Sequence, residues 1–266
     1  MASDPNFSSV SLLLHCDGAN GGTSFPDSGT LNKTVTATAT TTSTAQVKYG
    51  TASASFNGST SYLTSASNSA FAFGTGDFTV ECWTYNTGTT GRQSAIYDLG
   101  ATNSAGSFAL FSISGSWWVR VDGTAITLNT PVLSSHLNTW VHFAVVRSGT
   151  TVTIYINGIS MASATMPGNI TQSTPYIGKL GSFNGYNFLG YIDDLRITKG
   201  VARYTANFTP PTAAFPDSAG GTDYTLTCAA GSYAMTGVSA ILTYQQAPTI
   251  SLFYNIGMFT IGPLNR

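Results

Sequence analysis

Acidic and basic side chains are scarce in this sequence, so the few that could do chemistry stand out. The 266 residues include 10 lysines and arginines and 11 aspartates and glutamates, which is 8 % charged. Hydrolysis of a glycosidic bond needs two carboxylates that flank the bond, but Glu81 is the only glutamate and has no acid within three residues. No pattern of a catalytic triad or zinc site surrounds the three histidines, which are His15, His136 and His142. We therefore expect that the protein is not an enzyme.

The best candidate for binding chemistry is the segment SWWVRVDG (116–123). Successive side chains of a strand point to opposite faces, so Trp118 and Arg120 share one face. The other face suits the core and holds Trp117, Val119 and Val121. An indole can stack on a sugar ring and a guanidinium can bind hydroxyls or carboxylates, with Tyr186 and Asn187 as further candidates. The alternative is a half-buried tryptophan that packs against a neighbouring strand or subunit.

Five charged residues gather in the segment GYIDDLRITKGVARYTANFTPPTAAFP (190–216): Asp193, Asp194, Arg196, Lys199 and Arg203. Alternation alone would place apolar residues on both faces of this strand, because Ile192 is out of step with Leu195. We expect a β-bulge near Asp193–Asp194 to resolve the conflict. We also expect Asp193 or Asp194 to form ion pairs with Arg196, Lys199 or Arg203. The double proline that follows should end the strand, since proline cannot donate to a β-ladder.

The elements that position these residues are predicted to be β-strands. Short β-rich runs recur between clusters of Gly, Asn, Asp and Ser, which is typical of a sandwich or barrel. Residues 107–113 and 116–123 should form a hairpin, and residues 140–164 a three-stranded meander with a type I′ turn at Asn157-Gly158. Such a sheet buries one face and leaves the other in water. Residues 33–46 are interpreted as an edge strand or a long loop.

Composition narrows the function classes. Hydrophobic residues make up 42 % of the chain and aromatic residues 12 %, enough for a large core. The net charge is −1 without a basic block, so we expect no nucleic-acid partner. No apolar run is long enough for membrane insertion, and the first residues do not resemble a signal peptide. The cysteines are predicted to be free thiols of a protein made in a reducing cytoplasm; they are Cys16, Cys82 and Cys228.

The C-terminal part is predicted to be a separate β segment. GSYAMTG (231–237) and GMFTIG (257–262) form a repeat, and the return strand that follows the first copy has no counterpart after the second. We expect a neighbouring subunit or another partner to supply that pairing, and hence a homo-oligomer. The predicted organisation is an N-terminal arm, a main domain, a linker and a C-terminal β repeat segment, at residues 1–10, 11–216, 217–222 and 223–266.

Five blocks resemble, in order, the concanavalin A-like, laminin-G-like jelly rolls: LLLHCDGANGGTSFPDSG, GDFTVECWTY, WVHFAVVRSGTTVTIYINGI, PYIGKL and GYIDDLRITKGVARYTANFTPPT. The last block is similar to the laminin-G-like domains of tailed-phage virion proteins, and YTLTCAAGSYAMTG resembles a β repeat at the ends of phage structural proteins. The resemblance implies an all-β fold, a two-sheet antiparallel jelly-roll sandwich, used for binding or structure. It places the first and last strands of the main domain side by side.

The same resemblance implies a structural Ca²⁺ site where those two strands meet, although no cofactor is required. Asp193 would be one ligand, and Asp17 and Asp27 could add oxygens, since Ca²⁺ takes six to eight of them. The alternative is that each aspartate caps a turn or forms an ion pair.

Two functions follow as expectations. The first is a virion structural protein displayed on the capsid or tail surface of a tailed phage, in contact with other virion proteins. The second is a lectin-like module that binds a host-surface glycan for attachment or adhesion. The first expectation locates the protein in the virion, after synthesis in the host cytoplasm.

Overall fold

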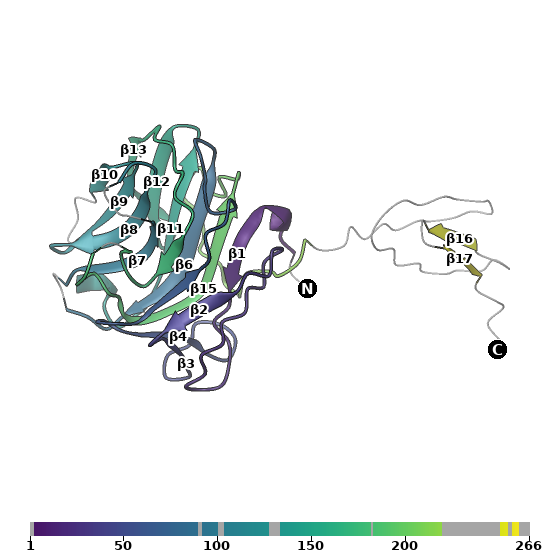
Figure 1. Ribbon diagram of the computed structural model, residues 1–266, viewed down its shortest axis with the longest axis horizontal. Coiled ribbons are helices and arrows are strands. Elements are labelled where there is room, and N and C mark those ends of the chain that lie inside the picture. The colour runs from purple at the N-terminus through teal and green to yellow at the C-terminus, as the bar shows by residue number, and fades with distance from the viewer. Residues whose placement is uncertain are drawn as a thin grey trace.

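The computed structural model describes residues 3–89, 92–100, 104–127, 134–181, 183–219, 251–254 and 257–260. Two antiparallel β-sheets pack face to face and enclose one large apolar core (Figure 1). The jelly-roll sandwich predicted from the sequence is therefore confirmed. The helices of the described residues are short 3₁₀ turns, Phe7–Ser9 and Ser134–His136, and neither could span a bilayer.

Sheet A is built around two long central strands, β6 (Phe78–Asn86) and β15 (Leu189–Lys199). On one side of β6 lies the predicted meander, and on the far side of β15 two strands lie end to end, β4 beside its first half and β1 beside its second. The remaining strands are β13 (Ile159–Thr165), β12 (Thr151–Ile156), β11 (Trp140–Ser148), β4 (Ser53–Asn57), β3 (Thr41–Ser43) and β1 (Val10–Leu14).

Sheet B contains the predicted hairpin of residues 107–123. Its order is β10 (Thr124–Thr127), β9 (Ser116–Val121), β8 (Phe108–Ile113), β7 (Ser94–Leu99), β14 (Pro175–Ile177), β5 (Tyr62–Ser65) and β2 (Val35–Thr38). Segment 33–46, expected to be an edge strand or a loop, supplies the edge strands β2 and β3 of both sheets. Ala39, in the left-handed region at φ 48°, lies between them.

The local sequence explains the geometry of two hairpin turns and the choice of the side chains that face the core. Asn157 and Gly158 have φ values of 49° and 76°, and Ser114 and Gly115 have 51° and 80°. Positive φ at both central residues is the type I′ geometry that matches strand twist. The side chains of the predicted core-facing set of β9, Trp117, Val119 and Val121, are buried between the sheets.

The first and last strands of the sandwich lie side by side, as predicted. β1 pairs with β15 in antiparallel register, with Leu14 opposite Leu195. The β15–β6 register shifts between Asp193 and Arg196, and Asp194 has a φ of 46°. The predicted bulge is therefore present, and it lets both Ile192 and Leu195 face the core.

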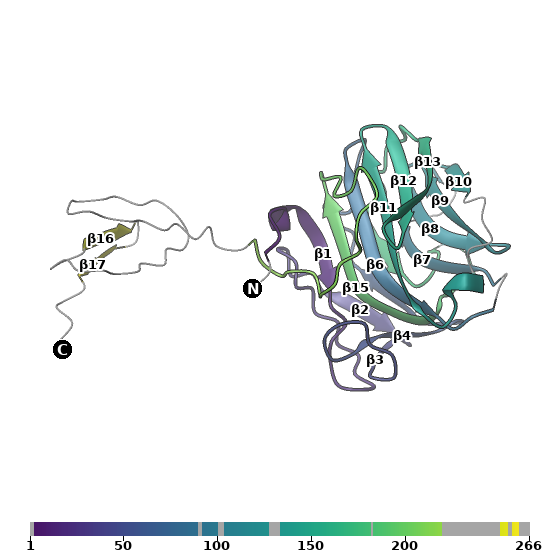
Figure 2. The same cartoon turned by 180° about the vertical axis from the view of Figure 1, so that it is seen from behind.

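The second face of the central strands of sheet A is covered by protein, and this corrects the expectation of one wet face for those strands. Residues 201–219, here called the strap, run across the outside of the central strands (Figure 2). Tyr204 and Phe208 stack with ring centroids 3.5 Å apart, and they pack on Ala144, Val146 and Tyr155. The central strands β6, β11 and β15 are thus buried on both faces, which periodicity within these strands could not reveal.

The described part of the C-terminal segment is a hairpin of β16 (Ser251–Tyr254) and β17 (Gly257–Thr260). The second copy of the predicted repeat begins with β17. The first copy, residues 231–237, lies outside the described residues, as does Cys228. Cys16 and Cys82 are free and buried. The domain boundaries stay predictions.

Candidate binding site on the outer face of sheet B

The β8–β9 hairpin presents an aromatic and cationic surface on its outer face. In the register of the hairpin Phe111 lies opposite Trp118, and Ala109 lies opposite Arg120. These side chains point away from the core, since the alternate residues of both strands fill it. The face predicted from strand alternation is therefore the face observed.

A loop after β14, described at residues 178–181 and 183–188, folds over this surface and is held by backbone hydrogen bonds. The Ala95 N–H donates to the Tyr186 carbonyl at 2.9 Å, and the Phe188 N–H donates to the Gly178 carbonyl at 2.8 Å. The Gly181 N–H donates to Asp98 Oδ2 at 2.6 Å. These contacts fix Tyr186 beside the β8–β9 hairpin.

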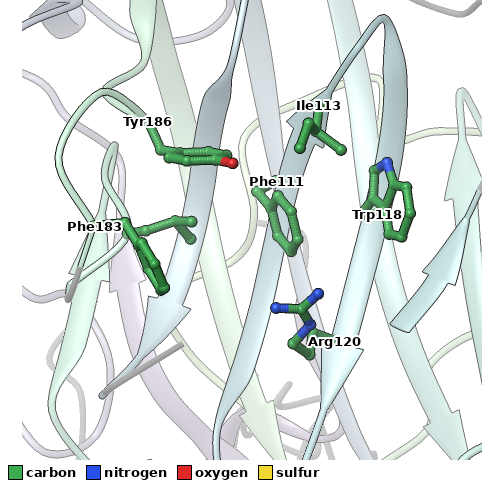
Figure 3. Close-up of a pocket in the computed structure, with 7 residues that line it drawn as sticks. Phe111, Ile113, Trp118, Arg120, Phe183 and Tyr186 are labelled. Atoms are coloured by element: carbon green, nitrogen blue, oxygen red, sulfur yellow. The ribbon is translucent and has the colours of Figure 1, made fainter. Parts of the chain in front are cut away.

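Between hairpin and loop lies a hollow of about 190 Å³ (Figure 3). Its lining residues are Phe111, Ile113, Trp118, Arg120, Leu180, Phe183 and Tyr186. The Phe111 and Trp118 rings are nearly parallel, with centroids 6.4 Å apart, and Tyr186 meets Phe111 edge-on at 6.0 Å. The Arg120 guanidinium lies 5.5 Å from the Phe111 centroid.

Two N–H donors at this hollow have no acceptor among the described residues. Trp118 Nε1 and Arg120 Nε are shielded from solvent and make no hydrogen bond within the described part of the chain. A buried donor without a partner costs about 1–3 kcal/mol. Because other atoms cover both N–H groups, an acceptor on a ligand reaches them only if those atoms move aside. The ligand first contacts the half-buried Trp118 and Arg120 side chains themselves.

Three of the four residues predicted for ligand binding come together here: Trp118, Arg120 and Tyr186 line the same hollow. Asn187 does not line it, because its side chain is 7 % exposed and the chain turns inward at Phe188. The residues that sequence analysis missed are Phe111, Ile113, Leu180 and Phe183. Alternation along SFALFSI would have indicated the first two, whereas the loop residues give no local signal.

The carboxylates considered for calcium accept hydrogen bonds from the protein itself. Asp27 Oδ1 accepts from the Leu13 and Gly29 N–H groups at 3.0 and 2.8 Å, and its Oδ2 accepts from the Lys33 N–H at 2.8 Å. Asp17 accepts from the backbone and hydroxyl of Thr51. No group of three His, Cys, Asp or Glu side chains in the described ranges is arranged to hold a metal. The calcium site stays a prediction.

Asp193, the third of these carboxylates, is fully buried. Its Oδ2 accepts from the Lys48 and Tyr49 N–H groups at 2.8 and 3.1 Å, whereas its Oδ1 has no hydrogen-bond partner among the described residues. Burial raises the pKa of Asp193 to about 7, against the lowering effect of the two N–H donors.

The charged residues of 190–203 do form ion pairs, but with other partners than we expected. Asp194 Oδ1 lies 2.8 Å from His15 Nδ1, a hydrogen bond that raises the pKa of this histidine. Arg196 and Arg203 both bind Asp4, at 3.1 and 2.8 Å. The left-handed backbone at Asp194 turns its carboxylate toward β1, away from the arginines. Lys199 Nζ donates to the Ser69 carbonyl.

Glu81 is the centre of this buried network. Its Oε1 accepts from Arg196 Nη2 at 2.8 Å, and its Oε2 accepts from the Tyr204 hydroxyl at 2.8 Å. Burial would raise the pKa of Glu81, but Arg196 and His142 lower it to about 2. The Glu81 carboxylate is therefore ionised and enclosed by protein groups. Its role is structural.

Residues 57–203, more than half of the chain, match the family model described as the concanavalin A-like lectin/glucanases superfamily. The chain belongs to this superfamily. Within that range lie the hairpin and loop that form the hollow, while β1 and most of the strap lie outside it. A search of curated protein sequences found no match.

Solved structures with the same concanavalin A-like architecture include receptor-binding domains of neurotoxins. The botulinum neurotoxin serotype D binding domain is 16 % identical over 75 % of this chain and 50 % of its own, with a TM-score of 0.57. Botulinum neurotoxin type C, whose cell entry depends upon interaction with two ganglioside molecules, is 14 % identical over 74 % and 49 %, with a TM-score of 0.55.

The binding domain of botulinum neurotoxin DC in complex with rat synaptotagmin II is 14 % identical over 74 % of this chain and 49 % of its own, with a TM-score of 0.55. This chain spans about half the length of these neurotoxin chains. At 14–16 % sequence identity, this structural similarity shows that the chains share a fold and nothing more.

Proposed function

We propose that the protein is a glycan-binding module whose binding site is the hollow on the outer face of sheet B. The observation that carries the proposal is the hollow itself, which is lined mainly by aromatic rings and holds one guanidinium, that of Arg120. Binding sites of small ligands are mostly apolar and aromatic, with a few polar groups that fix orientation. A sugar offers both an apolar ring face and oxygen acceptors.

The comparisons support this choice of ligand class. The superfamily is described by its lectins and glucanases, and cell entry of the type C neurotoxin depends on gangliosides, which are glycan-bearing lipids. Both statements concern other proteins. For this chain they make a sugar the first ligand to test.

The full-length chain applied to a glycan array tests the proposal. We expect binding to a restricted set of glycans, and Trp118→Ala should abolish it because the variant removes one wall of the hollow. Trp140→Ala is the matched control, since Trp140 packs on Tyr85 in sheet A at 5.6 Å. Absence of binding by the unaltered chain, or equal loss in both variants, would contradict the proposal.

We further propose that this module is carried on the capsid or tail surface of a tailed phage, among other virion proteins. The support is the similarity of GVARYTANFTPP and of the C-terminal repeat to phage structural proteins, together with a surface that has few charges. A protein outside the cell gains more from a large β core than from isolated surface ion pairs. Detection of this chain by mass spectrometry in purified particles tests the proposal, and its absence from them would contradict it.

A further inference from the structure

The hollow contains one charged residue, and that residue has no counter-ion in the part of the chain that the structure describes. Of the seven lining residues only Arg120 is charged. Its Nε lacks a hydrogen-bond partner, and no carboxylate of the described residues pairs with its guanidinium. Figure 3 shows the guanidinium directed toward Phe111, between the two sides of the hollow. The guanidinium thus lies beside the space that a ligand would occupy.

The other charged side chains near the outer face of sheet B interact with groups that do not line the hollow. Asp98 accepts the Gly181 N–H, and Asp122 accepts the Gly106 N–H at 2.5 Å. Lys179 lies over the Tyr62 ring at 4.4 Å, outside the hollow. A ligand in the hollow therefore meets a single positive charge on an aromatic surface.

The volume of the hollow limits what it can hold. At about 190 Å³ it is smaller than the pockets of about 300–1,000 Å³ that enclose drug-sized ligands. It suits one terminal sugar residue, with the rest of the glycan outside.

We propose that the ligand is a glycan that ends in a carboxylated sugar, such as a sialic or uronic acid. The inference rests on the glycan-binding function proposed above and adds the charge of the ligand. Arg120 binds the carboxylate, because the planar guanidinium fork matches two carboxylate oxygens and charge-assisted hydrogen bonds are the stronger class. Trp118 and Phe111 pack against the ring of the same sugar.

The experiment compares sugars that differ only in this charge. Isothermal titration measures binding of the full-length chain to sialyllactose, to its methyl ester and to lactose. A glucuronic acid-terminated disaccharide and its glucose-terminated counterpart form a second pair. We expect at least one acid to bind tenfold or more tightly than its neutral counterparts, which corresponds to about 1.4 kcal/mol.

Variants test whether Arg120 causes the preference for the acidic sugar. Arg120→Gln should reduce binding of the acid to the level of the neutral sugar, and Arg120→Lys should restore only part of the difference because it keeps the charge without the fork. Lys179→Gln removes the same charge from the same face and should leave the preference intact. Circular dichroism melting of each variant checks that it folds.

The negative results distinguish a wrong ligand charge from a wrong ligand class. If acids and neutral sugars bind equally, or if Lys179→Gln abolishes the preference as fully as Arg120→Gln, the inference is wrong while glycan binding stands. If the array yields only neutral glycans, the inference is wrong in the same way. If no glycan binds at all, the proposed function fails together with it.

Discussion

Two buried carboxylates on the outer face of sheet A have opposite surroundings. Glu81 is held by Arg196 and by the Tyr204 hydroxyl, and its pKa is lowered to about 2. Asp193 accepts backbone N–H groups on one oxygen and has no partner on the other within the described ranges, and its pKa is raised to about 7. The difference follows from whether a cation compensates the loss of hydration.

This difference predicts the pH dependence of an Asp193→Asn variant. Between the unperturbed pKa of 3.8 and the folded value of about 7, the unfolded state loses the proton that the folded state keeps. The wild type therefore loses stability as pH rises through this window. The variant stays neutral, so its melting temperature relative to the wild type should rise from pH 4 to pH 7 and then level off. By linkage, the shift of the Asp193 pKa from 3.8 to about 7 should make the stability difference between the two proteins grow by about 4 kcal/mol across this window.

Thermal melts of both proteins across that pH range provide the measurement. The asparagine carbonyl can still accept the Lys48 and Tyr49 N–H groups, so the fold should persist. A difference between the two proteins that does not change with pH would contradict the raised pKa of Asp193.

At the scale of elements, the strap closes the outer face of sheet A. The Phe208 N–H donates to the Gly158 carbonyl at 2.9 Å, and the Phe215 N–H donates to Asp194 Oδ2 at 2.7 Å. The Phe215 ring lies 3.8 Å from the Arg196 guanidinium. The strap thus excludes water from the Glu81 network and links it to the last strand.

Two glycines in the meander test the contribution of the strap. Gly149 and Gly158 both have positive φ, at 60° and 76°. A Cβ on Gly149 would meet nothing within 4 Å, whereas a Cβ on Gly158 would collide with the Phe208 carbonyl oxygen. Gly149→Ala should cost about 1–2 kcal/mol from backbone strain alone. Gly158→Ala should cost at least about 1 kcal/mol more, because the strap must also shift.

Urea denaturation of both variants gives the two costs, and limited proteolysis within the strap gives an independent readout. We expect faster cleavage of residues 201–219 in Gly158→Ala only. Equal destabilisation and equal cleavage would show that the strap contributes little.

The predictions that succeeded depend on local patterns. Alternation in SWWVRVDG placed Trp118 and Arg120 on one face, and Asn157-Gly158 identified a type I′ turn. The bulge at Asp194 followed from a conflict between apolar residues in one strand. The strap could not be predicted in this way, since residue types within a strand do not reveal what covers its second face. Asp4 was also missed, because its partner Arg196 is 192 positions away.

At the scale of the whole molecule, the two sheets have different outer faces. Sheet A is covered by the strap of the same chain, while the outer face of sheet B carries the hollow between its hairpin and the loop after β14. The proposed site therefore lies on sheet B. Its hairpin half was predictable from alternation, but its loop half depends on tertiary hydrogen bonds such as that from Ala95 to Tyr186.

Removal of residues 220–266 tests the proposed role of the C-terminal segment in assembly. The described strap ends before this segment, so a chain that ends at Ala219 should keep its melting temperature and its glycan binding. Light scattering after size-exclusion chromatography should show a multimer for the full chain and a smaller species for the truncated one. The same oligomeric state in both would contradict the assembly role.

The central claim is that the ligand binds at the hollow beside Trp118, and fluorine NMR tests it most directly. The chain has four tryptophans, and fluorinated tryptophan labels all of them. Trp117 and Trp83 are buried, and Trp140 lies in sheet A. On addition of a glycan identified by the array, the resonance assigned through Trp118→Phe should shift, while the other three stay in place. A stationary Trp118 resonance at saturating glycan would contradict the account.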